Sequence, residues 1–594
     1  MRMIFRYMKV YARRIASSMT VKLLGAVTEL MIPYILEHLI DEVVPLGQMR
    51  QVILWGLLMV ATALITRQLN VWANRMAIDN AHNVSYDIRQ DLFTKTANLS
   101  GAQFDAFGLP SLISRMTSDS YNVQSCVQTL QTLCVRVPMM LLGGIAVTMM
   151  MDAALSAILC VLVPVLIVVI LGVSRYGIPL YRRVQERLDD VVRVMREDIS
   201  GIRVVKALSK TEYEKRRFER SNEAMTRADI KASTIMAIPG PLMQMCLNIG
   251  LTLVVWLGAA RVDSGQIKPG VILAFLTYFN MVLQGVMGVN RIFIMVSKAS
   301  ASANRIAQVL DIEPDQRVLA PEEARTPTGD GFIRFEHVNF SYGEATEHSL
   351  AGGEREQCLY DINFSLKRGE SLGIIGPTGC GKSTIINLLM RFYDVEDGGV
   401  FVDGRDVRTY EKDELHRKFG VVFQNDMVFY NTLRENIRFG RELDDTALTR
   451  AVEDAVAAEY IDSLEEGLDY RADIKGANLS GGQRQRLLIS RALAGNPEIL
   501  ILDDSSSALD YKTDAALRKA LREEYQGITT IIIAQRVSSI LHADHILVLE
   551  EGKELGYGTH QELLRSCPVY QDIAHSQMGY SQDGALEARE KEVV

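Results

Sequence analysis

Cysteine is scarce in this sequence and is never closely paired. Seven cysteines are spread over 594 residues, and no two of them have the CxxC spacing. This distribution argues against a zinc ribbon and against a disulfide framework. A cleavable leader is also not expected, because no small-residue cleavage site follows a short apolar core near the start. Residues 1–14 instead mix Phe, Tyr, Met and Ile with five basic residues, which predicts an amphipathic surface helix.

Charge is missing from long stretches of the first half of the chain. Six apolar segments are each long enough for the roughly 20 residues that cross a bilayer. They lie at 18–40, 52–74, 133–151, 154–174, 242–262 and 271–296, and residues 154–174 contain no charge. The remainder has a mixed α/β pattern. The predicted fold is an α-helical transmembrane domain of six long spans, followed by a cytoplasmic α/β domain with a helical subdomain.

Lys and Arg indicate how the spans are oriented. Residues 175–231 hold fifteen of them, whereas the outer connection 41–51 holds one and 261–270 holds two. Both termini and the two long loops are therefore predicted to be cytoplasmic. We expect a multi-pass protein of a bacterial cell membrane, with residues 1–14 lying on the inner leaflet of the lipid bilayer.

The long inner connections, 75–132 and 175–239, are charged, rich in helix-forming residues and poor in proline. They predict that spans two to five continue as helices far into the cytoplasm. Each pair then ends in a short transverse element, expected at 102–114 and at 207–218. Plain amphipathic cytoplasmic helices are the alternative reading of these two segments.

Three charged residues fall inside the first two spans, where charge is costly. Glu29 and Glu37 are eight residues apart, hence on roughly one face of a helix. They either attract a cationic substrate into a central cavity, or they form structural pairs or lie at a water-exposed helix end. In the structural alternative, Glu29 pairs with Arg67 of the second span.

A complete phosphate-binding loop follows an apolar strand at 371–375 and leads into a helical pattern. Glycines let successive backbone N–H groups surround phosphate oxygens, and the helix dipole adds to the attraction. Lys382 supplies positive charge to ATP, and the Ser383 hydroxyl can bind Mg²⁺. The expected contacts are Gly376, Thr378, Gly379, Cys380, Gly381, Lys382, Ser383 and Thr384.

Two further motifs complete this pattern. The apolar strand 499–503 ends in Asp503, which is expected to hold Mg²⁺ through water. Upstream of it stands Leu479-Ser480-Gly481-Gly482-Gln483, followed by Arg484. With these motifs the sequence resembles the ATP-binding cassette (ABC) exporters that fuse six spans to one nucleotide-binding domain. The resemblance covers residues 1–575.

This resemblance implies roles for several residues. Tyr342 would stack on adenine, although an ordinary strand aromatic is the alternative. Gln424 would sense Mg²⁺ and the γ-phosphate, so the implied metal contacts are Ser383, Gln424 and Asp503. Ser480, Gly481, Gly482 and Gln483 would cap the γ-phosphate held by an opposing subunit. Ser507 to Asp510 would cross the dimer, and the segments 102–114 and 207–218 would be the two coupling helices.

The implied domains are a transmembrane domain at 1–310 with an amino-terminal elbow helix, a linker at 311–331, a nucleotide-binding domain at 332–575 and a disordered tail at 576–594. The segment 343–357 is expected to be an exposed loop.

Two residues depart from the family pattern at the catalytic centre. Asp504 stands where the family has the Glu that polarises water, and it is one methylene shorter. Gln535 stands where the family has a His that contacts the γ-phosphate, and it cannot exchange a proton. Together they predict a site that binds ATP and hydrolyses it poorly.

The expected assembly is a heterodimer with a second half-transporter that carries an intact Glu and His. A slow homodimer and an ATP-binding sensor, channel or scaffold are the alternatives. Hydrophobic drugs, lipids and peptides all remain candidate substrates, and no nucleic-acid partner is expected.

Overall fold

The computed structural model describes residues 1–343, 357–505, 509–525 and 527–578. It divides the chain into a helical unit, residues 1–97 and 110–312, and an α/β unit, residues 98–109 and 313 onward. The loop expected at 343–357 and the tail expected at 576–594 lie almost wholly outside the described residues.

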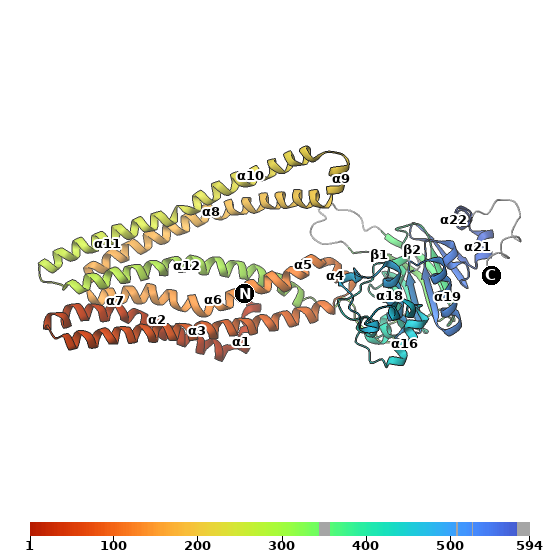
Figure 1. Cartoon of the computed structure of the whole chain (residues 1–594), viewed down its shortest axis with the longest axis horizontal. Helices are drawn as coiled ribbons and strands as arrows, with labels where there is room; N and C mark the ends of the chain where they lie inside the picture. Colours follow the sequence, from red (N-terminus) through yellow and green to blue (C-terminus); the bar gives the residue numbers. More distant parts are fainter. Residues whose placement is uncertain (344–356, 506–508, 526, 579–594) are drawn as a thin grey trace. The chain divides into compact units, whose positions relative to one another are not determined.

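The helical unit consists of long helices joined by short connections (Figure 1). Its elements are α1 (Arg2–Val10), α2 (Ala12–His38), η1 (Leu39–Val43), η2 (Val44–Leu46), α3 (Met49–Ala97), α5 (Leu109–Ser114), η3 (Arg115–Asp119), α6 (Ser120–Pro138), η4 (Met139–Gly143), α7 (Gly144–Met151), α8 (Ala153–Ser200), α9 (Ile202–Ala207), α10 (Thr211–Ala237), α11 (Pro239–Asp263) and α12 (Pro269–Leu310).

Several of these helices are much longer than a bilayer is thick. α3 has 49 residues and α8 has 48. At about 1.5 Å per residue each is roughly 70 Å long, against about 30 Å for the hydrocarbon core. Among the described residues, five helical segments are long and apolar enough to span a membrane, and α8 adds a shorter apolar stretch, Ala153–Val169. These six places correspond to the six predicted spans.

One predicted contact between spans is wrong. The Glu29 carboxylate pairs with Arg136 at 2.7 Å, and Arg67 is exposed. Depth along a span can be read from sequence, but the rotation of each helix about its axis depends on its neighbours. Glu29 therefore has a partner on the third span, not the second, which supports the structural reading of this charge.

The transverse elements also differ from their expected bounds. The first is α4 (Gly101–Phe107), which begins where the Ser100 hydroxyl accepts from the N–H of Gln103. It ends at Gly108, where φ is +72° and α5 follows. The second is α9, so the expected segment 207–218 is wrong in position. Residues 208–210 form a turn, and 211–218 already belong to α10, because their helical pattern continues without a break.

The described residues of the α/β unit form a ten-stranded mixed sheet, in the order β5-β4-β1-β2-β10-β9-β3-β8-β7-β6. Its strands are β1 (Ile333–Ser341), β2 (Gln357–Leu366), β3 (Ser371–Ile375), β4 (Asp397–Val402), β5 (Arg405–Asp406), β6 (Phe419–Val422), β7 (Ile499–Asp503), β8 (Thr529–Ile533), β9 (His545–Glu550) and β10 (Lys553–Gly558). Strands β9, β3, β8, β7 and β6 run parallel.

Helices accompany this sheet. They are α13 (Lys382–Leu389), η5 (Val407–Thr409), α14 (Lys412–Arg417), α15 (Leu433–Arg438), α16 (Asp445–Asp454), α17 (Ala458–Asp462), η6 (Gly467–Asp469), η7 (Ile474–Gly476), α18 (Gly481–Leu493), α19 (Tyr511–Glu524), α20 (Val537–Ile540), α21 (His560–Ser566) and α22 (Pro568–Met578). β7 is buried at every position, as expected of a parallel strand covered on both faces. The segments from α15 to α18 gather round a separate apolar cluster, which makes the predicted helical subdomain.

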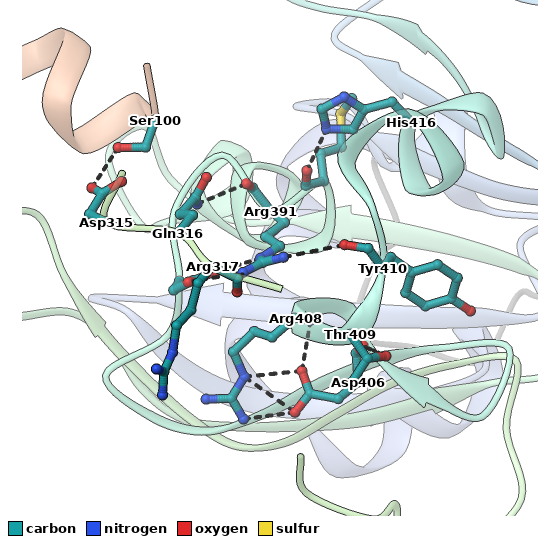
Figure 2. Close-up of polar contacts among 12 residues, drawn as sticks. Ser100, Asp315, Gln316, Arg317, Arg391, Asp406, Arg408, Thr409, Tyr410 and His416 are labelled. Carbon is teal, nitrogen blue, oxygen red and sulfur yellow. Dashed lines mark hydrogen bonds and ion pairs between the residues drawn. The ribbon is translucent and has the colours of Figure 1, made fainter. Parts of the chain in front are cut away.

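The linker segment is bound to the α/β unit through Arg391, which is 4% exposed (Figure 2). Its guanidinium donates to the carbonyl oxygens of Arg317, at 2.7 Å, and of Tyr410, at 3.4 Å. Its own carbonyl oxygen accepts from the Gln316 amide at 3.0 Å. Asp394 balances the buried charge at 2.9 Å. The start of the linker is therefore part of the folded domain.

Candidate nucleotide-binding site

The loop between β3 and α13 has the backbone of a phosphate cradle. Gly379 and Gly381 have φ of +86° and +99°, a region that glycine enters without a Cβ penalty. A Cβ atom on Gly376 would lie 2.1 Å from the carbonyl oxygen of Leu549, so a larger residue does not fit. The loop leads into the amino end of α13, where the helix dipole attracts anions.

Positive charge is held at this loop by Lys382. Its Nζ donates to the carbonyl oxygens of Gly376, at 2.8 Å, and Pro377, at 2.7 Å. Cys380 beneath it is buried, and burial raises the pKa of its thiol, so this side chain stays neutral. Thr378 at the tip of the loop is exposed. The loop is thus electropositive and open to an anion.

A hydroxyl and a carboxylate meet beside the loop. Ser383 Oγ donates to Asp503 Oδ2 at 3.0 Å. Asp503 is 5% exposed, and burial raises the pKa of its carboxyl, with Ser383 and Lys382 opposing that shift. Such hard oxygen donors suit Mg²⁺, which binds through one or two carboxylates plus phosphates and water.

Gln424 lies on the same edge of the sheet as Asp503. Strands β6 and β7 run parallel with Val422 opposite Leu502, so both strands end at that edge. Gln424 follows β6 and is exposed. Ligands bind at this edge in open α/β sheets, outside the carboxyl ends of the strands.

The two residues that depart from the family pattern contact each other. β7 and β8 pair with Asp503 opposite Ile533, which brings together the residues that follow each strand. Gln535 Nε2 donates to Asp504 Oδ2 at 3.2 Å. The backbone N–H of Asp504 donates to Ile533 O at 3.0 Å, and its φ is +50°. The Asp504 side chain is therefore held by a neutral amide, on a constrained backbone.

Tyr342 is anchored to the helix that follows the phosphate loop. Its hydroxyl lies 3.1 Å from Thr384 Oγ1 and accepts from the Asn387 amide at 3.3 Å. Its ring makes edge contacts with Phe340 and Tyr393. Tyr342, the residue expected to stack on adenine, thus lies next to the phosphate loop.

The signature residues form a group of their own at the start of α18. Ser480 Oγ accepts from the N–H of Gln483 at 3.2 Å, and Gln483 Oε1 accepts from the N–H of Ser480 at 2.9 Å. This capping box fixes the amino end of the helix. Ser480 and Gly481 are exposed and Gly482 is half-buried. These exposed residues therefore form a surface that a second molecule can contact.

Asp510 begins α19. Its carboxylate accepts hydrogen bonds from the backbone N–H of Thr513 at 2.9 Å and from the Thr513 hydroxyl at 2.7 Å. These bonds lower the pKa of the Asp510 carboxyl. Ser507 and Ala508 of the same motif lie outside the described residues.

Two features near the site were not predicted from the sequence. Gln577 on α22 makes two hydrogen bonds to the segment that carries Gln535. Tyr393, which contacts Tyr342, also donates to Asp105 of α4 at 2.5 Å. Burial, and next the bond to Asp105, raise the pKa of Tyr393. No local sequence motif identifies Gln577 or Tyr393, because their partners lie far away in the sequence and are brought near only by the fold.

Comparison with known proteins gives consistent matches along the chain. Residues 15–287 match the ABC transporter transmembrane region and residues 359–507 the ABC transporter family. An uncharacterised ABC transporter ATP-binding protein of Mycobacterium tuberculosis is 32% identical over 576 residues, covering 96% of this chain and 97% of that protein. YfiB of Bacillus subtilis, another uncharacterised ABC transporter ATP-binding protein, is 33% identical over 577 residues, covering 96% and 98%.

Two further matches come from a relative named as a flippase and from a solved structure. The ATP-dependent lipid A-core flippase of Desulfotalea psychrophila is 32% identical over 492 residues, covering 83% of this chain and 84% of that protein. A bacterial Atm1-family ABC exporter solved with ATP bound superimposes with a TM-score of 0.77 at 22% identity, covering 96% of this chain and 99% of that one, and so has the same fold. The chain thus belongs to the ABC transporter family, as a membrane protein that fuses a transmembrane domain to an ATP-binding domain in the exporter arrangement.

Proposed function

We propose that this chain is one subunit of a heterodimeric ABC exporter. It binds Mg²⁺ and ATP at a site that hydrolyses slowly, and it supplies an intact signature to a faster site of its partner. The observation that carries this proposal is the 3.2 Å hydrogen bond between Gln535 and Asp504, at the two positions where the family has His and Glu.

Nucleotide binding is retained in this proposal. The cradle from Gly376 to Thr384 holds the phosphates, with Lys382 neutralising their charge. Tyr342 stacks on adenine. Ser383, Asp503 and Gln424 hold Mg²⁺, which when bound neutralises the charge of the β- and γ-phosphates. The 3.0 Å hydrogen bond between Ser383 and Asp503 supports this assignment, because it holds two oxygen ligands side by side next to the loop.

Hydrolysis is weak for two reasons that reinforce each other. A general base must come within about 2.6–3.2 Å of the proton it takes, and Asp504 is one methylene shorter than Glu. The other reason lies in Gln535, whose amide can donate a hydrogen bond to the γ-phosphate of bound ATP but has no proton to exchange and no positive charge. The amide also occupies one oxygen of the carboxylate that should act as the base.

The signature supports a division of labour between two chains. Ser480, Gly481, Gly482 and Gln483 are all present, and the capping box orders them. They cap ATP on the partner chain, whose own Glu and His hydrolyse it. Asp510 lies at the crossing between the two domains. One chain thus contributes to one slow site and to one fast site.

The proposed cargo is hydrophobic or amphipathic and moves out of the cytoplasm. The similarity to a protein named a lipid A-core flippase favours an amphiphilic lipid over a drug or a peptide. The α/β domain and both termini are cytoplasmic. We assign residues 1–310 to the transmembrane domain and 311–331 to the linker. The nucleotide-binding domain begins at residue 332 and extends past the expected bound at 575, because α22 continues to Met578, and the tail follows it.

The test is ATP turnover by the chain alone and by a co-expressed pair. In lipid nanodiscs the chain alone should bind Mg·ATP and turn over slowly. Together with a half-transporter that carries Glu and His at these positions, it should form a 1:1 complex of much higher activity. Fast turnover by the chain alone, abolished by Lys382→Ala, would overturn the heterodimer in favour of a homodimer. ATP binding without turnover in any pairing would favour a sensor or channel.

A further inference from the structure

The segment after β8 carries Gln535 and is held from outside the nucleotide site. It runs from Ala534 to Arg536 and leads into α20. Both Gln535 and Arg536 are exposed, so packing alone does not fix them. A two-point contact from α22 reaches this segment near the carboxyl end of the described chain.

Gln577 makes this contact. Its Nε2 donates to the carbonyl oxygen of Gln535 at 2.8 Å. Its Oε1 accepts from the backbone N–H of Val537 at 2.8 Å. A glutamine amide has one donor side and one acceptor side, so Gln577 bonds to the backbone on both sides of Arg536. It therefore fixes the rotation of this backbone as well as its position.

The helix that presents Gln577 rests on the same apolar cluster as α20. Tyr570 and Ala574 of α22 are fully buried, as is Val537 of α20. The Tyr570 hydroxyl also lies 2.7 Å from His560 Nδ1 on α21, which ties the two terminal helices together. α22 is thus a rigid support, and the Gln577 side chain extends from it to the segment that carries Gln535.

These hydrogen bonds connect Gln577 with Asp504 through Gln535. Gln577 bonds to the backbone of Gln535, and the Gln535 side chain bonds to Asp504. We propose that Gln577 is a positioning residue that holds Gln535 where it meets the γ-phosphate. This inference rests on the proposed function, in which Gln535 contacts the γ-phosphate of ATP bound to this chain.

The consequence is selective for the nucleotide. ADP lacks the γ-phosphate, so Gln577 should matter for ATP and not for ADP. A purely structural residue would affect both nucleotides alike. Loss of one or two neutral hydrogen bonds predicts a weakening of about three- to tenfold in the affinity for ATP.

The experiment compares three variants of the full chain in nanodiscs, with Kd measured for Mg·ATP and for Mg·ADP by calorimetry. Gln577→Met keeps the length of the side chain and removes both bonds. Gln535→Ala removes the amide that is expected to contact the phosphate. Gln571→Met is the matched control, because Gln571 lies on the same helix and bonds to the carbonyl oxygen of Leu564 at 2.7 Å.

We expect Gln577→Met and Gln535→Ala to raise the Kd for ATP and to leave the Kd for ADP unchanged, with Gln571→Met like the parent chain. If Gln535→Ala weakens ATP binding and Gln577→Met does not, the positioning role is wrong and the proposed function stands. Equal weakening of ATP and ADP by Gln577→Met would also overturn it. If Gln535→Ala leaves ATP binding unchanged, the γ-phosphate role of Gln535 fails, and the inference fails with it.

Discussion

At the scale of single residues, the proposed slow hydrolysis depends on Asp504, which has the charge of a general base and is one methylene shorter than Glu. A φ of +50° costs a non-glycine residue energy, so its backbone has little freedom to move the carboxylate forward. Gln535 donates to one of its oxygens, which makes that oxygen a weaker proton acceptor. Because the two side chains are in contact, their effects on hydrolysis are expected to be non-additive. In the proposed function, either substitution alone would disturb the catalytic pair, and both together would replace it.

A first prediction separates the two roles of this chain. Ser480→Arg places a bulky cation where the exposed signature meets the partner's nucleotide, so ATPase of the pair should fall by more than about a hundredfold. Asp504→Asn should change the rate less than about threefold, because this carboxylate is already a poor base. The measurement is steady-state ATPase of the co-purified pair. Near-total loss from both variants would mean that Asp504 is catalytic.

At the scale of elements, α4 is bound to the α/β unit at its start and in its middle. The N–H of Gly101 donates to the carbonyl oxygen of Phe392 at 2.9 Å. A Cβ on Gly101 would lie 2.7 Å from the Tyr393 ring, so glycine is what permits the close approach. Tyr393 also donates to Asp105 and touches Tyr342 edge-on. The short helix expected to couple the domains therefore lies next to the residue expected to hold adenine.

A second prediction concerns this attachment. Tyr393→Phe keeps the ring and removes the hydrogen bond to a charged acceptor, a contact of about 1.5–3 kcal/mol. Amide hydrogen exchange of residues 98–109 should become faster. Tyr410→Phe is the control, since the Tyr410 hydroxyl bonds to the carbonyl oxygen of Val402 in the same unit. Unchanged exchange in 98–109 would show that the remaining contacts hold α4, namely the Gly101 backbone bond and the side-chain bonds of Ser100 to Asp315 and of Gln103 to the carbonyl oxygen of Glu313.

What the sequence could reveal depends on whether a feature is local. The apolar spans and the loop from Gly376 to Thr384 are continuous in sequence, so their patterns predict them. The predicted pairing of Glu29 with Arg67 was wrong because the rotation of each helix about its axis is set by packing among three spans. The second transverse helix was misplaced because 211–218 have the composition of any helix. Gln577 had no signal, because its partners lie about 40 residues earlier and are backbone atoms.

At the scale of the whole molecule, this chain would hold half of each of two sites in the proposed pair. Its phosphate loop, Asp504 and Gln535 would belong to one site, and its signature to the other. The two sites would therefore differ in rate, although each chain has the same fold. The proposed slow site keeps its binding residues, so its nucleotide would be a structural element of the working transporter. Retained ATP would bias the helical units toward a subset of conformations, which needs only about 1–3 kcal/mol of coupling.

The last prediction tests this retention. In the turning-over pair, ATP bound to Lys382, Ser383 and Asp503 should persist through many turnovers of the partner's site, because the hydrolytic pair is absent. Asp504→Glu combined with Gln535→His should shorten its residence and make the cycle more symmetric, since a base with full reach and a proton-exchanging partner return together. The measurement is exchange of radiolabelled nucleotide at each site during turnover, with Gln571→Met as a control for changes near α22. If ATP leaves this chain's site as fast as it leaves the partner's, retention is wrong. The contact between Gln535 and Asp504 would then have no part in the transport cycle.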